Sequence, residues 1–267
     1  MRPALTDPVI EAAALSRIAR PRLLDARDKE AFAAGHAEGA VSVPVARWVE
    51  AAKSSEASFA DVDFWEREIA GLGLAQDPVA VVYDDGRMTE AARVWFILQH
   101  FGARAVVLNG GWPALNNGTT TPAGPGASGG AAFRARANAG AVGLVERTDL
   151  KAALVKSAIF DTRTAAEHAG KDLKKNPRGG HLPGARLLPH GDLLDNGFLK
   201  PADTLRALIT AAGFRPGDHI VTHCDGGGRA ALAALAAVRA GFEDVNVYYL
   251  SFADWAKDES CPIETPR

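Results

Sequence analysis

The chain has 267 residues, 47% of them hydrophobic and 23% charged, and a formal net charge of −2 at pH 7. This length suits one large domain or two of about 130 residues, and the near-neutral charge argues against nucleic acid or an anionic membrane as a partner. The sequence also lacks a secretory signal and any run of about 20 apolar residues. With only two cysteines, a soluble cytoplasmic protein without a disulfide framework is expected.

The first half of the chain alternates short apolar runs with helical patterns. Residues 23–44 combine an apolar pair with Asp-x-Arg, then Gly-His-x-x-Gly-Ala and a proline. Residues 78–84 and 105–109 are short, apolar and β-branched, which predicts strands buried on both faces. A helix is predicted between them, over 89–102, with a glycine as its C-terminal stop. This alternation predicts an α/β fold with a mostly parallel sheet flanked by helices.

A stretch rich in Gly, Pro, Thr and Ser follows, without helical or strand periodicity. Such composition is typical of a linker rather than of a core element. We therefore predict one domain over residues 1–115, a linker over 116–141 and a second domain over 142–267.

The second half repeats the first. Residues 159–189 echo the Asp-x-Arg and Gly-His-x-x-Gly-Ala signals, and residues 219–250 repeat the strand, helix and strand pattern. Asp84 of the first copy corresponds to Cys224 of the second. The chain is thus predicted to contain two related domains.

Cys224 opens the sequence "CDGGGR", between a predicted strand and a predicted helix. Ligands of parallel α/β sheets sit beyond the carboxyl ends of strands. The glycines allow successive N–H groups to point inward as an anion-holding concavity, and the helix start adds partial positive charge. Both favour a thiolate, and Arg229 adds a full positive charge. We interpret Cys224 as a nucleophile; the alternative is a buried structural cysteine.

The loop length separates two chemistries. Cys-dependent phosphatases place five residues between the cysteine and the arginine, whereas here four residues separate Cys224 from Arg229. The shorter loop, the paired Asp-x-Arg motifs and the sequences "LNGGWPAL" and "LSFADW" together resemble the tandem-domain rhodaneses, which are thiosulfate or 3-mercaptopyruvate sulfurtransferases. The resemblance covers nearly the whole chain. Phosphatase or arsenate reductase chemistry is the less favoured interpretation.

The resemblance implies two rhodanese-like domains, the first inactive because Asp84 stands where the nucleophile would be. It implies that Cys224 takes sulfur from a small anionic donor such as thiosulfate, forms a persulfide and passes the sulfur to cyanide or a thiol. The alternatives are a 3-mercaptopyruvate sulfurtransferase, or a persulfide carrier that exchanges sulfur with a partner protein. No metal or organic cofactor is implied. The expected substrate-binding residues are Asp225, Gly226, Gly227, Gly228, Arg229 and Arg163.

Several residues outside the loop carry expectations of their own. His223 precedes Cys224 in a strand and is expected to point away from it, in a packing role. Cys261, near the C-terminus, is expected to be an exposed bystander. Arg163 has a counterpart in the first copy, Arg27. A structural role is therefore the alternative to substrate binding for Arg163. Asp225 and Glu167 are acidic residues at positions where the family pattern has other residues. They are expected to affect which sulfur donor the site accepts.

Overall fold

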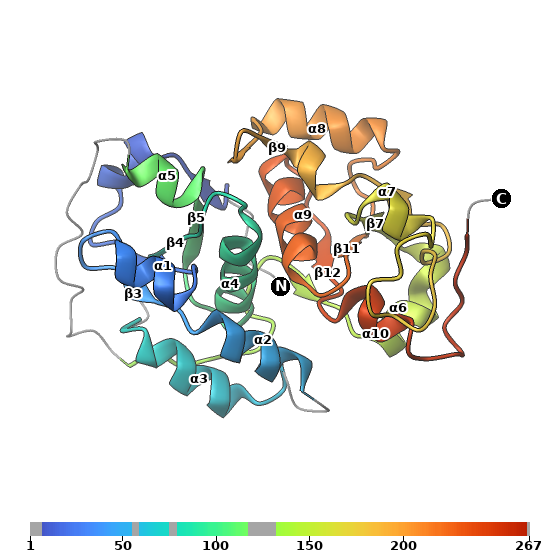
Figure 1. The fold of residues 1–267 in the computed structure, drawn as a ribbon, viewed down its shortest axis with the longest axis horizontal. Coiled ribbons are helices and arrows are strands. Elements are labelled where there is room, and N and C mark those ends of the chain that lie inside the picture. Colours follow the sequence, from blue (N-terminus) through green and yellow to red (C-terminus); the bar gives the residue numbers. More distant parts are fainter. Residues whose placement is uncertain (1–6, 55–58, 75–78, 117–131, 266–267) are drawn as a thin grey trace. The chain divides into compact units, whose positions relative to one another are not determined.

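Two sets of parallel strands organise the chain in the computed structural model, which describes residues 7–54, 59–74, 79–116 and 132–265 (Figure 1). Unit 1 comprises Met1–Ala141 with Asn196–Phe198, and unit 2 comprises Val142–Asp195 with Leu199–Arg267. Of the predicted linker, residues 117–131 lie outside the described residues. Residues 132–141 belong to unit 1, where Phe133 is buried.

Unit 1 is built on a five-stranded sheet with the order β1-β5-β4-β2-β3, and every neighbouring pair is parallel. Its strands are β1 (Val9–Ile10), β2 (Arg22–Asp25), β3 (Val41–Ser42), β4 (Ala80–Tyr83) and β5 (Ala105–Leu108). Its helices are η1 (Ala12–Arg17), α1 (Lys29–Ala34), α2 (Val45–Lys53), α3 (Val62–Gly71), α4 (Thr89–His100) and α5 (Gly111–Asn116).

Unit 2 has a second five-stranded parallel sheet, in the order β6-β12-β11-β7-β8, which follows the same topology. Its strands are β6 (Gly143–Leu144), β7 (Ala158–Asp161), β8 (Arg186–Leu187), β11 (Ile220–His223) and β12 (Val245–Val247). Its helices are α6 (Arg147–Ala153), η2 (Leu154–Lys156), α7 (Ala165–His168), η3 (His190–Leu193), α8 (Ala202–Ala211), α9 (Gly228–Arg239) and α10 (Ser251–Trp255). A two-stranded sheet joins β9 (Leu194–Asp195) and β10 (Phe198–Leu199).

The predicted α/β class with two parallel-sheet domains is confirmed. All four residues of β4 and all four of β11 are buried, as expected of central strands covered on both faces. Gly102 and Gly241 follow α4 and α9 with φ of 86° and 84°, the left-handed conformation that ends many helices. The last strand of the pattern predicted over 219–250 is β12, which stops at Val247 because the chain turns there toward α10.

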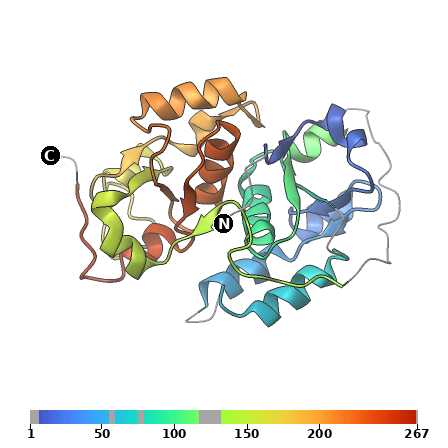
Figure 2. The ribbon, with the colours of Figure 1, turned by 180° about the vertical axis from the view of Figure 1, so that it is seen from behind.

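One edge of the unit 2 sheet collects three strand ends. His223 is in register with Asp161, and Asp161 with Leu187, so β11, β7 and β8 finish side by side. Helix α9 starts just beyond this edge and packs against β11, β12 and α8 (Figures 1 and 2). Residues that directly follow these strands therefore meet near the N-terminus of α9.

Within the described part of the chain, none of the helices combines the length and the apolar character needed to cross a lipid bilayer.

Candidate active site

Cys224 lies directly after β11, and its sulfur faces the turn that leads into α9. The N–H groups of Gly226 and Gly227 lie 3.3 and 3.1 Å from Sγ. Gly227 has a φ of 97°, which glycine adopts readily and other residues rarely do. This backbone conformation lets the turn close around the sulfur. Two backbone donors and a helix N-terminus thus converge on one atom, an arrangement that stabilises negative charge on sulfur.

Ser251 also contacts Cys224, which was not predicted from the sequence. Its Oγ accepts a hydrogen bond from the Cys224 N–H at 3.1 Å and lies 3.7 Å from Sγ. Ser251 is buried and has a φ of 60°, close to the 59° of Gly111 in unit 1. The two residues hold matching places in the fold, because each begins a helix whose next residue, Phe252 or Trp112, donates to the carbonyl of Cys224 or Asp84. The motifs "LSFADW" and "LNGGWPAL" do not align these two positions, so no signal for Ser251 was available in the sequence.

Arg229 does not extend into open space. Its Nη1 and Nη2 each lie 2.7 Å from one carboxylate oxygen of Glu167, a bidentate pair that is among the stronger ion-pair geometries. Glu167 is itself fixed, because it forms a capping box with Thr164 at the start of α7. Burial opposes the charge on Glu167, but the Arg229 guanidinium and the Thr164 N–H outweigh it and lower the pKa of Glu167 to about 2.

This pair predicts a pH-dependent difference in stability between the wild type and Glu167→Gln. Because the folded-state pKa of Glu167 is depressed, its stabilisation is present above the unfolded-state pKa and is lost progressively from about pH 5 to pH 2. The wild type should exceed the variant by about 3 kcal/mol at pH 7, and most of that gap should close by pH 2. Urea unfolding at both pH values measures it; a gap independent of pH contradicts the ion pair.

Asp225 and its glycine neighbours form the rest of the loop. The Asp225 carboxylate accepts a hydrogen bond from the Asn176 side-chain amide at 2.7 Å. Across the residues that the structure describes, Asp225 forms no ion pair, either with Arg229 or with another cation. Gly228 begins α9 and is buried. The predicted loop residues thus surround Cys224, but the guanidinium among them is engaged by Glu167.

Arg163, predicted as a substrate-binding residue, lies in a buried network. Its guanidinium donates to Asp161 at 2.7–3.2 Å and to the Gly180 carbonyl at 2.8 Å, and it stacks 4.0 Å from the Phe252 ring centroid. The side chain is 2% exposed. Substrate binding by Arg163 stays a prediction, and this geometry favours the structural role.

His223 extends the same network. Its Nε2 lies 3.7 Å from Asp161, and the side chain is fully buried. Burial lowers the pKa of His223 to about 4, so the imidazole is neutral near pH 7. The Cys224 sulfur receives its hydrogen bonds from Gly226, Gly227 and Ser251, whereas the His223 ring lies beside the Cys224 carbonyl. This location matches the expected packing role.

Unit 1 has a corresponding loop, in which Asp84 takes the place of Cys224. The Asp84 carboxylate accepts hydrogen bonds from the N–H groups of Gly86, Met88, Glu90 and Ala91 at 2.9–3.1 Å. The inward-pointing donors of this copy are thus satisfied by a side chain of the chain itself. The inactivity predicted for unit 1 remains a proposal, which this self-filled loop supports.

The structural part of the repeat is also preserved in unit 1. Arg27 donates to Asp25 and to the Gly35 carbonyl, as Arg163 does to Asp161 and Gly180 in unit 2. The rings of Phe32 and His36 stack with centroids 3.8 Å apart. In unit 2 the rings of His168 and His181 stack at the same separation. Both Gly-His motifs therefore serve the fold.

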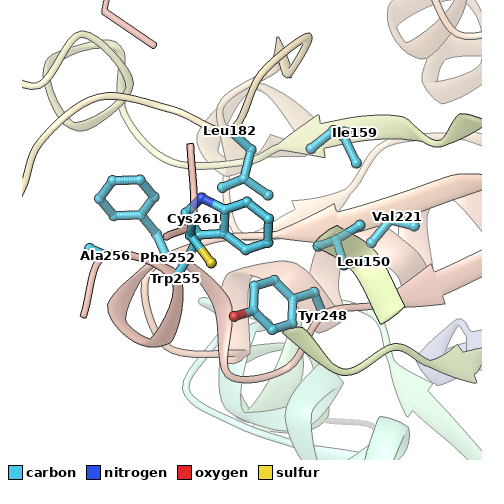
Figure 3. Close-up of a cluster of buried hydrophobic side chains, with 9 residues drawn as sticks. All are labelled: Leu150, Ile159, Leu182, Val221, Tyr248, Phe252, Trp255, Ala256 and Cys261. Atoms are coloured by element: carbon cyan, nitrogen blue, oxygen red, sulfur yellow. The ribbon is translucent and has the colours of Figure 1, made fainter. Parts of the chain in front are cut away.

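The expectation that Cys261 is exposed is wrong. Its side chain is fully buried in a hydrophobic cluster, where it lies among Leu150, Leu182, Tyr248 and Trp255 (Figure 3). The polar neighbours in "DESCPIE" suggest exposure, but the chain turns this one side chain inward. Burial raises the pKa of the Cys261 thiol, which keeps it protonated and unreactive. Cys224 is buried as well, at 1% exposure, so the two cysteines differ in the N–H donors around the sulfur and not in their exposure.

Two matching α/β units define a protein built from two copies of one small parallel-sheet domain, and the second copy has a cysteine bound by two backbone N–H donors. The Rhodanese-like domain model matches residues 10–117 and 146–258, and the chain belongs to this family. Groups of three or more His, Cys, Asp or Glu side chains suited to a metal ion are absent from the described residues.

Similar proteins of known activity are sulfurtransferases. The 3-mercaptopyruvate sulfurtransferase of Escherichia coli K12 is 28% identical over 262 residues, covering 93% of this chain and 90% of that protein. The thiosulfate sulfurtransferase of Gallus gallus is 30% identical over 206 residues, covering 75% of this chain and 69% of that protein. The relatives thus include two donor specificities at nearly the same identity.

Solved structures share the fold. The crystal structure of SseA from Escherichia coli superposes with a TM-score of 0.72 at 24% identity, covering 92% of this chain and 99% of that one. An anaerobic ergothioneine biosynthesis enzyme from Chlorobium limicola gives a TM-score of 0.78 at 18% identity, covering 98% and 71%. At these identities the likeness concerns the fold alone.

Proposed function

We propose that the chain is a sulfurtransferase in which Cys224 carries the transferred sulfur as a persulfide. The observation that carries the proposal is the cysteine sulfur held 3.1–3.3 Å from two backbone N–H groups at the start of α9. The family membership and the sulfurtransferase relatives support the reaction class. The candidate donors are thiosulfate, which the resemblance named first, and 3-mercaptopyruvate, its alternative; the relatives include enzymes named for each of them.

The first half-reaction loads the enzyme. The Cys224 thiolate attacks the outer sulfur of thiosulfate, the S–S bond of the donor breaks, and sulfite leaves with the electron pair. With 3-mercaptopyruvate the C–S bond breaks instead, and the carbon takes the electron pair and the thiol proton, giving pyruvate. Either route leaves a cysteine persulfide, whose outer sulfur bears the negative charge. The inward-pointing N–H groups of the loop support that charge.

The second half-reaction returns the thiolate. Cyanide attacks the outer sulfur, the persulfide S–S bond breaks, and thiocyanate leaves while Cys224 regains its electron pair. A thiol, or a cysteine of a sulfur-accepting protein, serves in the same way and takes the sulfur as its own persulfide. A reducing cytoplasm would keep both free cysteines as thiols between cycles.

The test is the intact mass of the wild-type protein after brief incubation with thiosulfate and, separately, with 3-mercaptopyruvate. We expect a gain of one sulfur atom, removed when cyanide is added. The donor that loads faster identifies the substrate class. No gain from either donor would contradict a small-donor sulfurtransferase and favour a carrier that receives its sulfur from a protein.

A further inference from the structure

The charges around Cys224 are arranged so that the loop cation is neutralised. Arg229 is the one cationic residue between positions 224 and 229. Both of its terminal nitrogens are 2.7 Å from Glu167 oxygens. The two N–H groups that could bind an oxyanion in bidentate fashion are therefore already bound to a carboxylate. An anionic ligand can use this edge only by displacing Glu167.

Glu167 is not easily displaced. Its carboxylate is 2% exposed, accepts the Thr164 N–H at 3.0 Å and stays ionised far below neutral pH. Removing it from Arg229 would leave a desolvated negative charge without its partner, which is costly. The ion pair is therefore a fixed part of the site, not a temporary occupant of it.

The neighbouring charges do not restore a positive balance within unit 2. The Asp225 carboxylate accepts a hydrogen bond from the neutral amide of Asn176, and its negative charge adds to that of Glu167 in the surroundings of Arg229. Lys174 pairs with Asp172 at 2.9 Å. Lys175 is exposed to solvent, where its field is screened. The charged side chains named above thus sum to zero, three cations against three carboxylates, and offer an incoming anionic donor no excess of positive charge.

We propose that Glu167 is a specificity-determining residue, which makes the Cys224 site prefer sulfur donors of low negative charge over thiosulfate. This inference rests on the proposed sulfur transfer through Cys224. Repulsion by a fixed carboxylate grows with the charge of the ligand, so a dianion is penalised about twice as much as a monoanion. On charge alone, 3-mercaptopyruvate, with one carboxylate, ranks ahead of thiosulfate.

A matched pair of donors isolates the charge. Methanethiosulfonate has the same transferable sulfur as thiosulfate, but a methyl group replaces one oxygen and removes one negative charge. The second-order rate constants for loading Cys224 with each donor are measured by intact mass. In Glu167→Gln, which keeps a capping-box residue, the ratio of thiosulfate to methanethiosulfonate should rise at least about tenfold relative to wild type. An unchanged ratio would overturn the inference.

Two further variants separate a local effect of Glu167 from a global change in charge. Glu243→Gln removes the same charge from an exposed residue at the amino end of β12, opposite the sheet edge that holds Cys224, and should leave the ratio unchanged. Glu167→Asp keeps the charge and should keep the wild-type preference. A tenfold rise in Glu243→Gln would show that global charge, not Glu167, sets the ranking.

Alkylation of Cys224 tests the effect of the Glu167 charge without any sulfur transfer. Iodoacetate and iodoacetamide alkylate thiolates alike but differ by one negative charge. The ratio of the iodoacetate rate to the iodoacetamide rate at Cys224 should rise in Glu167→Gln and stay constant in Glu243→Gln. If no donor loads the wild type and this ratio rises, the proposed function fails, the donor preference fails with it, and only the effect of Glu167 on the charge around Cys224 stands. If donors load and both ratios ignore Glu167, the inference fails and the function stands.

Discussion

Cys224→Ser is expected to lower the rate of sulfur loading by at least about a thousandfold, because a serine hydroxyl cannot form a persulfide and is far less nucleophilic than a thiolate. The change is nearly isosteric, so the N–H donors of Gly226 and Gly227 keep an acceptor and the fold should persist. Intact mass after incubation with thiosulfate, with 3-mercaptopyruvate and with methanethiosulfonate measures the loss.

Cys261→Ala is the matched control, since it removes the other thiol of the chain from a buried apolar cluster. It should load sulfur at the wild-type rate, with a small loss of stability from the void left by the sulfur. If Cys261→Ala abolished loading while Cys224→Ser retained it, the assignment of the nucleophile would be reversed.

Arg163→Ala is expected to lower the free energy of unfolding by about 3–5 kcal/mol, the usual cost of leaving a buried charge without its partner. The variant strips the guanidinium bonds from the fully buried Asp161 and one from the Gly180 carbonyl. Urea unfolding, followed by a signal from unit 2, measures the change.

Lys151→Ala serves as its control. The Lys151 ammonium donates to the exposed Ser260 hydroxyl at 2.6 Å, and loss of a solvent-exposed contact costs little. The pair of variants also decides between the two competing roles of Arg163. An Arg163→Ala protein of wild-type stability but with a strongly raised KM for the donor would establish substrate binding and refute the structural role.

The fold, and the position of Cys224 in a loop of N–H donors, were predictable because their signals are local. The alternation of apolar runs with helical patterns lies within short windows, and Cys224 is followed directly by the glycines that shape its loop. The recurrence of Asp25 and Asp161 with their arginines showed which motifs belong to the scaffold. In each unit the arginine binds the aspartate two positions earlier, a contact between near neighbours in the chain.

The electrostatics of the site were not predictable, because they depend on contacts between distant positions. Glu167 and Arg229 are 62 residues apart, and each alone looked like a free charge. Ser251, 27 residues from Cys224, looked like part of a closing motif. The direction of the Cys261 side chain likewise depends on how the C-terminal segment packs. Composition and spacing report none of these contacts.

The carboxylate of Asp84 is bound by two N–H groups of its own loop and by two of the first turn of α4, which shows a second use of the duplicated loop. The loop binds a negatively charged side chain of its own chain, and the identity of that side chain decides what the loop can do. A carboxylate, which has no sulfur to exchange, fills the loop permanently with internal hydrogen bonds. A thiolate at the same place would be free to take up and release sulfur, as proposed for Cys224. On that proposal, one scaffold serves a structural role in the first half of the chain and a chemical role in the second, through the identity of a single side chain.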